Sequence, residues 1–439
     1  MLEYNNKLSD IIDLCISSAK KKGATDAEVS IIKSTAETVS FRNKKLDESD
    51  RSENIGLSLT AYINKKKTSV SSSNLKKDNL EMLIERCVEA AKVTPEDEHN
   101  SLPDEKLYFK NSDELDLFDK THLENNQKID YLKEAEEVAF KNNEIVNTNG
   151  SSFSESKTEV ILGNSKGFKN GYKTSNFTAY CEVVSKNNGS MERDYEFTSK
   201  RHFEDLLKPS ELGSNAAKFA IRKLKPQKIN SGKFDIIFDK RISKNFLNYF
   251  SSAITGSSIY RGTSFLKGKL NKKIFSDNIN IVDRADIKRG NGSKYFDNEG
   301  VKIQNLSLVN NGVLNDYLMD TYYGNKLNII SNGRSGGTTN LYFENGKQNL
   351  KDLMNSNNKI FYVTETIGHG TNIVTGDYSL GAGGMMIENG EFVYPISEVT
   401  IAGNLNEMFM KMILANDLEF NYSTNAPSML INSMTVAGK

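Results

Sequence analysis

The stretch I-G-L-S-L-T-A-Y-I-N-K-K-K-T-S-V-S-S-S, residues 55–73, decides the first part of the fold. Leu57, Leu59 and Ala61 alternate with other residues, which is the two-residue period of a strand with one buried face. The polar run at 64–67 interrupts this period. The stretch therefore predicts a β-hairpin whose turn lies at 64–67.

Helices flank this hairpin in the chain. Residues 8–19 place apolar side chains on one helical face, and Asp78 with Glu81 forms a candidate capping box for a second helix. Further strands are expected at 27–33 and 37–43. We predict an N-terminal domain, residues 1–105, in which two layers form an α/β region with an antiparallel sheet.

The polar segment 94–106 indicates a linker to a central α+β region, residues 106–224. Two helices, at 129–142 and 211–224, flank a strand-rich meander in this region. Its turns are expected at three Asn- and Gly-rich sites: 164–167, 170–171 and 187–189.

The segment K-P-Q-K-I-N-S-G, residues 225–232, is the best domain boundary in the chain, and we expect a β-rich C-terminal domain at 230–439 with mixed and antiparallel sheets. This domain opens with a strand at 233–239 and a helix at 241–254. Asn-Gly pairs at 311–312, 345–346 and 389–390 each predict a type I′ hairpin, because both central residues of that turn need positive φ.

Composition excludes several classes of protein. The 57 basic and 57 acidic residues cancel, which favours neither nucleic acid nor an anionic membrane as a partner. No apolar run is long enough to span a membrane, and Asp10 and Asp13 interrupt any signal peptide. Three widely spaced cysteines without a C-x-x-C fit a reducing compartment. We expect a cytoplasmic protein.

The four histidines, His99, His122, His202 and His369, are far apart in the chain. A zinc site needs three or four converging ligands, and there is no H-E-x-x-H, so no metal site is predicted from them. Four carboxylates in one loop-rich stretch have two interpretations, a magnesium site or a solvated charged loop. They are Asp283, Asp286, Asp297 and Glu299.

One of the four histidines lies in T-I-G-H-G-T-N-I-V-T-G-D-Y-S-L-G-A-G-G, residues 366–384. The stretch contains His369 and Asp377, but the chain has no G-x-S-x-G elbow, and the glycines form neither a P-loop nor a G-x-G-x-x-G. The residues alone therefore give an unusual loop and no complete catalytic set.

Longer motifs resemble the TldD/PmbA family. They include Y-R-G-T-S-F-L-K-G-K-L at 260–270, Y-F-D-N-E-G at 295–300, G-H-G-T-N-I-V-T-G-D-Y-S-L-G-A-G-G at 368–384 and E-V-T-I-A-G-N-L at 398–405. G-A-T-D-A-E-V-S at 23–30 also matches, so the resemblance covers nearly the whole chain.

The resemblance implies a cytosolic zinc peptidase built from two related subunits, which trims unfolded peptides and matures some peptide antibiotics. The TldD type has H-E-x-x-x-H on a helix and a cysteine in a late loop, whereas the PmbA type, also called TldE, lacks them. Here the helix is matched by residues 241–253, without His or Glu, and the loop by 421–428, without Cys. The chain is thus similar to the PmbA type, with no catalytic residue and no metal of its own; zinc is expected on a TldD-like partner.

We expect the Gly-rich loop to form a surface for an extended peptide, bound as an added strand, or for the partner subunit. Its residues are Gly368, His369, Gly370, Asn372, Thr375, Gly376 and Asp377. The competing reading is a loop that only packs against its own domain.

Two other functions remain open. One is a stand-alone hydrolase with an unrecognised site near His369 and Asp377, and the other is a non-enzymatic regulator of a gyrase-like partner, because the family was once called modulator of DNA gyrase. The resemblance also implies dimers, so a homodimer of the isolated chain is compatible with it.

Overall fold

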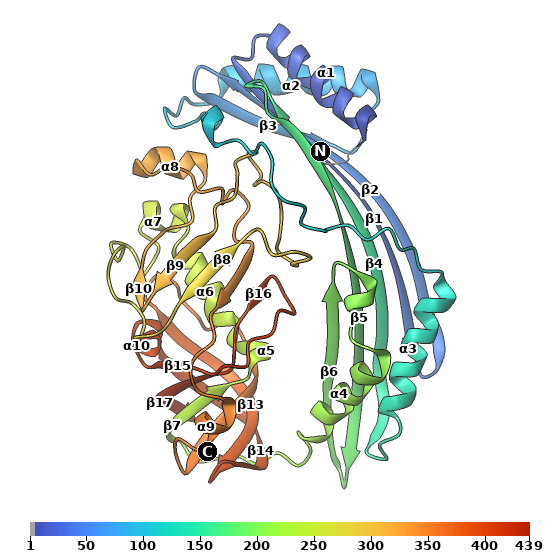
Figure 1. Ribbon diagram of the computed structural model, residues 1–439, viewed down its shortest axis with the longest axis vertical. Helices are drawn as coiled ribbons and strands as arrows, with labels where there is room; N and C mark the ends of the chain where they lie inside the picture. Colours follow the sequence, from blue (N-terminus) through green and yellow to red (C-terminus); the bar gives the residue numbers. More distant parts are fainter. Residues whose placement is uncertain (1–4) are drawn as a thin grey trace.

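The computed structural model describes residues 5–439. Figure 1 shows a long curved sheet with helices against it, beside a second body made mostly of strands. This arrangement confirms the α+β class, with an antiparallel sheet in the first half of the chain and a β-rich C-terminal domain that contains a mixed sheet. No helix of residues 5–439 is long and apolar enough to cross a membrane.

The first half alternates long strands with helices. Its elements are α1 (Asn6–Lys21), β1 (Asp26–Arg42), β2 (Lys45–Ile63), β3 (Lys66–Ser72), α2 (Lys77–Val93), η1 (Glu105–Leu107), α3 (Asn125–Ala139), β4 (Ile145–Asn164), β5 (Lys169–Asn187), β6 (Ser190–Lys200), η2 (Phe203–Asp205) and α4 (Pro209–Ile221). The hairpin expected at 64–67 is confirmed as the β2–β3 connection.

All six of these strands form one antiparallel sheet in the order β3-β2-β1-β4-β5-β6. β1 is a single strand where the sequence indicates two, because its residues pair with β4 without interruption from Glu28 to Phe41. Strands from the regions 1–105 and 106–224 therefore share a sheet. The boundary between these two regions stays a prediction about folding units.

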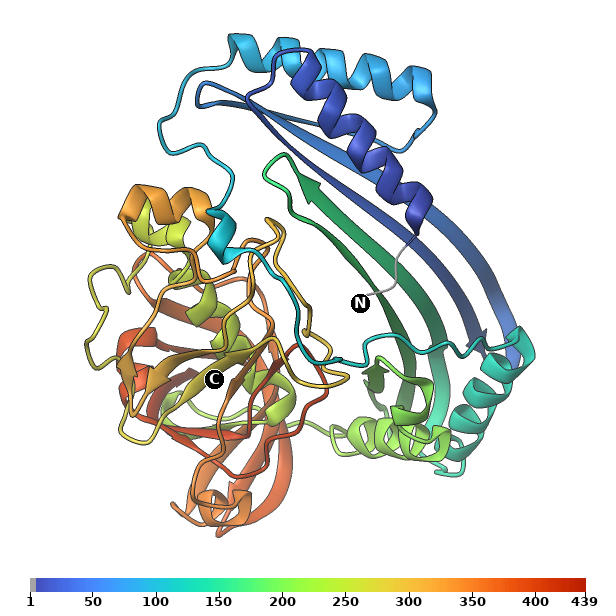
Figure 2. The same ribbon diagram turned by 45° about the horizontal axis from the view of Figure 1, so that its top comes forward.

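The helices α1 to α4 all cover the same face of the sheet. Val29 and Ile31 of β1 pack with α1 and α2, whereas Val39 and Phe41 pack with α3 and α4. Residues two apart on a strand share a face, so the two helix pairs lie on one face at opposite ends of the sheet (Figure 2). The other face is left free to meet the C-terminal domain.

Aromatic side chains join that free face to the C-terminal domain. The ring centroids of Phe168, from the β4–β5 turn, and Phe296 are 5.3 Å apart. Gly300 lies so close to the Phe168 ring that a Cβ would be 2.5 Å from it. The amide of Phe109, in the connecting segment (residues 94–124), donates to the Gly300 carbonyl at 2.9 Å. The connecting segment thus runs along the junction between the two bodies (Figure 1).

The C-terminal domain contains short helices and two sheets. Its elements are β7 (Gly232–Phe238), α5 (Lys240–Ser243), α6 (Asn245–Ala253), α7 (Gly256–Arg261), β8 (Ile281–Arg284), β9 (Leu306–Asn310), β10 (Val313–Leu314), α8 (Thr321–Leu327), β11 (Asn340–Phe343), α9 (Leu350–Met354), β12 (Lys359–Ile367), β13 (Asp377–Glu388), β14 (Glu391–Asn404), α10 (Leu405–Met410), β15 (Met412–Leu414), β16 (Thr424–Asn425) and β17 (Met429–Ala437).

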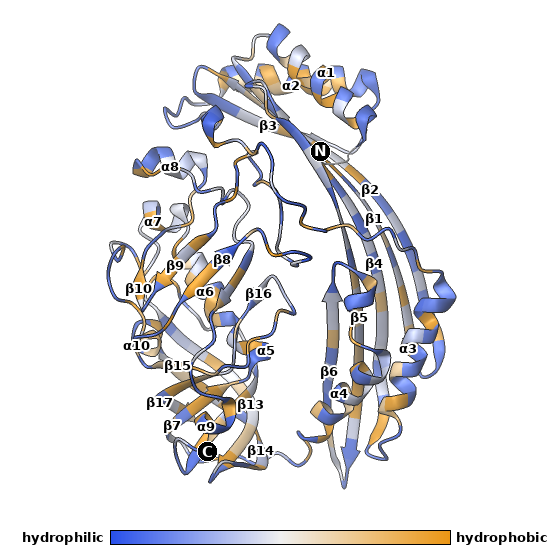
Figure 3. Ribbon diagram, viewed as in Figure 1, coloured by the Kyte–Doolittle hydropathy of each residue, from blue (hydrophilic) through white to orange (hydrophobic). Residues whose placement is uncertain are grey.

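The larger sheet of this domain closes on itself. Its order is β14-β13-β12-β7-β17-β15, and β14 also pairs with β17, so five strands form a ring with β15 attached. β7 and β12 are parallel, whereas the other neighbours are antiparallel. Figure 3 shows hydrophobic residues concentrated in these strands, and they supply much of the largest core in the molecule.

Two of the three Asn-Gly hairpins are confirmed. Asn311-Gly312 and Asn389-Gly390 have positive φ at both residues and connect β9 to β10 and β13 to β14. The prediction at Asn345-Gly346 is wrong, because neither residue has positive φ. Gly346 is needed there for another reason: a Cβ would lie 1.8 Å from the carbonyl oxygen of Leu414.

Three further local predictions are wrong. Asn170-Gly171 lies inside β5, because the β4–β5 turn has already closed at residues 164–168. Helix α2 begins at Lys77 and its N-cap, Lys76, makes no side-chain cap, so Asp78 and Glu81 form no capping box. The single helix expected at 241–254 is divided at Lys244 into α5 and α6.

Candidate functional site

Residues 241–253 match the zinc-binding helix of the TldD type, and residues 421–428 match its cysteine loop. These two segments meet in the structure. Ser243 Oγ, at the end of α5, donates a hydrogen bond to the carbonyl of Pro427 at 2.8 Å. The ammonium of Lys244 lies over the ring of Tyr422. Lys244 has no hydrogen bond or ion pair from its ammonium within residues 5–439, and burial lowers its pKa to about 8.

The residues at this meeting point do not fit a zinc ion. Zinc takes Cys, His or carboxylate ligands, and neither 241–253 nor 421–428 contains one of them. The nearby carboxylates are engaged: Asp239 accepts from the amide of Arg241 at 2.8 Å and from the Tyr362 hydroxyl at 2.8 Å. Glu419 pairs with Lys240. We therefore assign no metal chemistry to this site.

The Gly-rich loop leads into a residue that packs on α6. Tyr378, at the end of the loop, stacks on Phe246 with centroids 5.7 Å apart and contacts Tyr249 at 6.3 Å. The amide of Phe265 donates to the carbonyl of Ile373 within the loop at 2.9 Å. The structure thus brings Tyr378, directly after the Gly-rich loop, to α6 and the loop 421–428 to the end of α5.

Three polar side chains of the Gly-rich loop stabilise the loop itself. Asn372 Oδ1 accepts from the amide of Val374 at 2.8 Å, and Thr375 Oγ1 donates to Asp377 at 2.6 Å. Hydrogen bonds from Thr375 and Asn404 lower the pKa of Asp377. Asn372, Thr375 and Asp377 therefore have a local structural role.

His369 differs from these three residues. Its side chain is exposed and has no hydrogen-bond or ion-pair partner among the described residues. Gly368 before it has φ of 102°, and a Cβ on Gly370 after it would lie 1.7 Å from the carbonyl oxygen of Ser379. The two glycines thus permit a tight turn that presents the imidazole to solvent; Ile367 and Val374 of the same stretch are also exposed.

A cavity of about 360 Å³, which we call the β6 groove, lies between β6, α4, α5 and residues 419–426. A row of aromatic rings leads into it from β5 and β6: the centroids of Tyr180 and Tyr195 are 5.3 Å apart, those of Tyr195 and Phe197 6.2 Å, and those of Phe197 and Tyr422 5.2 Å. Sequence reasoning missed this row. The alternation Tyr195-x-Phe197 hints at it, but Tyr422 is distant in the chain.

Charged side chains form one wall of the β6 groove. The ring of Phe219 has the guanidinium carbons of Arg222 and Arg241 at 4.6 and 4.1 Å from its centroid. Asp194 and Asp239 each approach Arg241 to 3.6 Å. These contacts join α4 to α5 and hold the wall of the groove in place.

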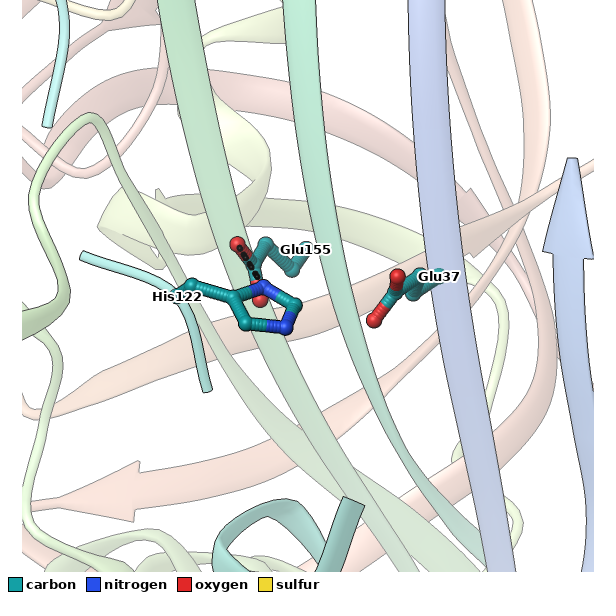
Figure 4. A group of neighbouring side chains, drawn as sticks. All are labelled: Glu37, His122 and Glu155. Atoms are coloured by element: carbon teal, nitrogen blue, oxygen red, sulfur yellow. Dashed lines mark ion pairs between the residues drawn. The ribbon is translucent and has the colours of Figure 1, made fainter. Parts of the chain in front are cut away.

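One group of described residues has the spacing of metal ligands: Glu37, His122 and Glu155, whose ligand atoms lie within 4.8 Å of one another (Figure 4). The buried ammonium of Lys128 already lies 2.7 Å from Glu37 and 3.3 Å from Glu155. Arg51 approaches the same Glu37 to 3.2 Å. A divalent cation would have to compete with these cations, so we interpret the group as an ion-pair network.

The four carboxylates considered for magnesium do not converge on one another. Each has its own partner: Asp283 pairs with Arg334, Asp286 with Arg284, and Asp297 and Glu299 accept hydrogen bonds from backbone amides. These contacts favour the reading of this stretch as structural loops.

The chain is similar to known proteins along nearly its whole length. Models of the PmbA/TldA metallopeptidase family match three successive parts of the chain: domain 1 at residues 27–91, the central domain at 119–224 and the C-terminal domain at 231–438. The metalloprotease PmbA homolog of Haemophilus influenzae is 33% identical over 435 residues, which cover 98% of this chain and 96% of that protein. Metalloprotease PmbA of Escherichia coli O157:H7 is 31% identical over 97% of this chain and 94% of its own.

Solved structures show the same fold. The crystal structure of a proposed modulator of DNA gyrase from Bacteroides thetaiotaomicron has a TM-score of 0.93 at 29% identity, covering 99% of this chain and 100% of that one. TldE from Thermococcus kodakarensis is similar in fold, with a TM-score of 0.86 at 18% identity over 98% of this chain and 100% of its own. With three matching domain models and close to full-length relatives, the chain belongs to the PmbA/TldD family of metallopeptidases.

Proposed function

We propose that this chain is the non-catalytic, PmbA/TldE-type subunit of a cytoplasmic zinc peptidase, and that a TldD-like partner supplies the zinc ion and the general base. The observation that supports this proposal most directly is the meeting of 241–253 with 421–428. Two segments that would hold the metal in the catalytic subunit lie together here with a lysine, a serine and a tyrosine at their contact.

The substrate in this proposal is an unfolded or extended peptide that lies along β6 in the β6 groove. β6 is an end strand of its sheet, and the amides of Tyr195 and Phe197 donate to the carboxylates of their own neighbours, Asp194 and Glu196, at 2.8 and 3.0 Å. A peptide can replace these local bonds with backbone bonds and rest side chains on the aromatic row. Such binding selects for extended backbone more than for sequence.

The Gly-rich loop has a separate role in the proposal. Asn372, Thr375 and Asp377 hold its shape, whereas His369 with its apolar neighbours Ile367 and Val374 offers a surface to the partner subunit. Chemical crosslinks between this loop and the partner subunit are therefore expected in the mixed complex. In the absence of a partner we expect two copies of the chain to associate.

Activity on unfolded casein tests the proposal. The chain alone should be inactive with or without zinc, whereas a mixture with a TldD-like subunit should be active and lose activity with a chelator. Activity of the purified chain alone would instead favour a stand-alone hydrolase. An inactive mixture whose two proteins do not co-elute would favour the regulatory alternative.

A substitution in the aromatic row tests the groove. Phe197→Ala should raise the KM of the mixed complex while kcat stays near its original value, because the ring contributes to uniform binding of the peptide. Met191→Ala is the matched control, since Met191 is exposed on the same strand but makes no contact in the aromatic row. Equal effects of the two substitutions would contradict a peptide site here.

A further inference from the structure

A second cavity, of about 830 Å³, lies under the connecting segment and shares no lining residue with the β6 groove. Residues 111–114 of the connecting segment form one side of it, and residues 294 and 302–305 of the C-terminal domain form the other. We call it the strap cavity. Its volume is within the range of small-molecule sites, roughly 300–1,000 Å³.

The C-terminal side of the strap cavity presents two unpaired cations. Neither Lys294 nor Lys302 has a hydrogen bond or ion pair from its ammonium within residues 5–439. Lys294 is half-buried, and this burial lowers its pKa, while Asp297 and Arg334 act on it with opposite signs. An ammonium that has lost water without gaining an acceptor is poised to bind an anion.

The connecting segment presents two unpaired anions to the same cavity. Asp113 and Glu114 are exposed, line the cavity and have no cation within ion-pair distance among the described residues. Asp286, a third acid at the wall, is already neutralised by Arg284 at 2.9 Å and accepts a hydrogen bond from Asn305 at 2.6 Å. Charges of opposite sign thus face one space without pairing with each other.

Other groups around the cavity can accept or donate hydrogen bonds. The side-chain amide of Gln304 has no partner among residues 5–439, whereas the Tyr295 hydroxyl accepts from the amide of Leu115 at 3.1 Å. The second contact fixes the end of the segment that carries the two acids. The backbone beside the acids is therefore held against the C-terminal domain.

We propose that the strap cavity binds a short peptide with both termini charged, its carboxylate at Lys294 and Lys302 and its ammonium at Asp113 and Glu114. A ligand with only one charge would leave the opposite pair unsatisfied. A zwitterion satisfies both, and a di- or tripeptide is a small ligand that has these charges at its two ends.

Calorimetric titration of the full chain with Ala-Ala, acetyl-Ala-Ala and Ala-Ala-amide tests the proposal. Ala-Ala should bind saturably, and each blocked peptide should bind about tenfold more weakly, because one charge-assisted contact is lost. Inorganic phosphate serves as the probe for a plain anion site. Absence of saturable binding of Ala-Ala, or phosphate binding as tightly as Ala-Ala, would overturn the proposal.

Lys294→Met tests which end of the peptide lies where. It should weaken Ala-Ala about tenfold but leave the affinity for Ala-Ala-amide unchanged, since the amide has no carboxylate for Lys294 to bind. Lys133→Met, at an exposed lysine of α3 outside this cavity, should change neither affinity. An equal loss for the free and amidated peptides would contradict the assignment.

A second variant controls for a folding defect of Lys294→Met. If Lys294→Met shifts the thermal unfolding of the chain, Lys302→Met replaces it, because Lys302 is exposed and its loss creates no buried gap. The paired substitution Asp113→Asn with Glu114→Gln should weaken Ala-Ala and leave acetyl-Ala-Ala unaffected. Affinity for Ala-Ala that survives both tests would exclude the strap cavity as the site.

Discussion

His369 is the polar residue of the Gly-rich loop whose side chain does not stabilise the loop. Its imidazole makes no hydrogen bond or ion pair among the described residues, whereas Asn372, Thr375 and Asp377 are hydrogen-bonded within the loop. An exposed side chain on a turn is free to act on another molecule, and its removal has no effect on packing. This separation makes a clean test possible.

His369→Ala should leave the free energy of unfolding within about 0.5 kcal/mol of the original and leave metal content unchanged. Its effect should appear as weaker association with a TldD-like subunit. Chemical denaturation, metal analysis and co-elution measure the three quantities. Loss of a bound metal would overturn the assignment of this loop as a surface without metal.

Gly370→Ala should destabilise the chain by about 1–3 kcal/mol, because the new Cβ would lie 1.7 Å from the Ser379 carbonyl oxygen. Gly56→Ala is the control, since no atom lies within 4 Å of a Cβ there and its φ is not positive. Thermal unfolding compares the two variants. A similar stability for both would mean that the loop can relax around the added methyl group.

At the scale of elements, α3 is tied to the sheet by charge as well as by apolar packing. Lys128 is fully buried on α3, with its ammonium bonded to Glu37 of β1 and Glu155 of β4. A buried cation is tolerated only when its partners remain in place. The helix and the two strands are therefore coupled through one side chain.

Lys128→Met should cost on the order of 3–5 kcal/mol of stability, because it leaves two carboxylates without their buried cation. Lys92→Met is the control, since Lys92 forms an exposed pair with Glu89 at 2.6 Å within α2 and such pairs contribute about 0–1 kcal/mol. Denaturant unfolding measures both. Equal losses would contradict the ion pairs of Lys128 with Glu37 and Glu155.

The same network predicts a pH dependence. The hydrogen bond from Lys128 lowers the pKa of Glu37 below its usual 4.5, with Arg51 and His122 adding to the effect. The stabilisation is therefore complete above pH 4.5 and is lost as the pH falls through the lowered folded-state pKa. Acid titration of stability should be steeper for the original chain than for Lys128→Met.

At the scale of the whole molecule, three carboxyl groups gather where the sheet meets the C-terminal domain. Burial raises the pKa of Glu28 to about 8, that of Glu299 to about 7 and that of Asp297 to about 6; Asp297 raises the pKa of Glu299 further, and both raise that of Glu28. Lys67, Lys294 and Asp320 are the other charges that act on them. The junction therefore favours protonated acids.

Glu28→Gln should stabilise the chain at pH 8 and flatten its stability profile between about pH 4.5 and pH 8. Raised folded-state values mean that stability is fully present below the usual pKa of 4.5 and is lost as the pH rises through about 8. Denaturant unfolding across this range measures the slope. Glu53→Gln, at an exposed acid paired with Lys33, should leave the alkaline slope as it is.

Local sequence signals predicted the structure correctly where residues within one short stretch set the backbone conformation. Asn389-Gly390 predicts its own turn, because the two residues need no distant contact to favour positive φ. Asn345-Gly346 carries the same signal and makes no hairpin, since the approach of Leu414 decides the conformation of the glycine. The same limit applies to the candidate site, where Lys244 and Tyr422 are remote in the chain.

The sequence by itself determined the α+β class, most strands and helices, the family resemblance and the lack of zinc ligands in 241–253 and 421–428, because periodicity and residue type are local properties. Only the tertiary structure decided that one sheet spans the first two regions, that the loop 421–428 meets the end of α5, and that unpaired charges line the strap cavity from both sides. These features depend on strand pairing and domain packing, which bring together residues that no spacing in the chain relates.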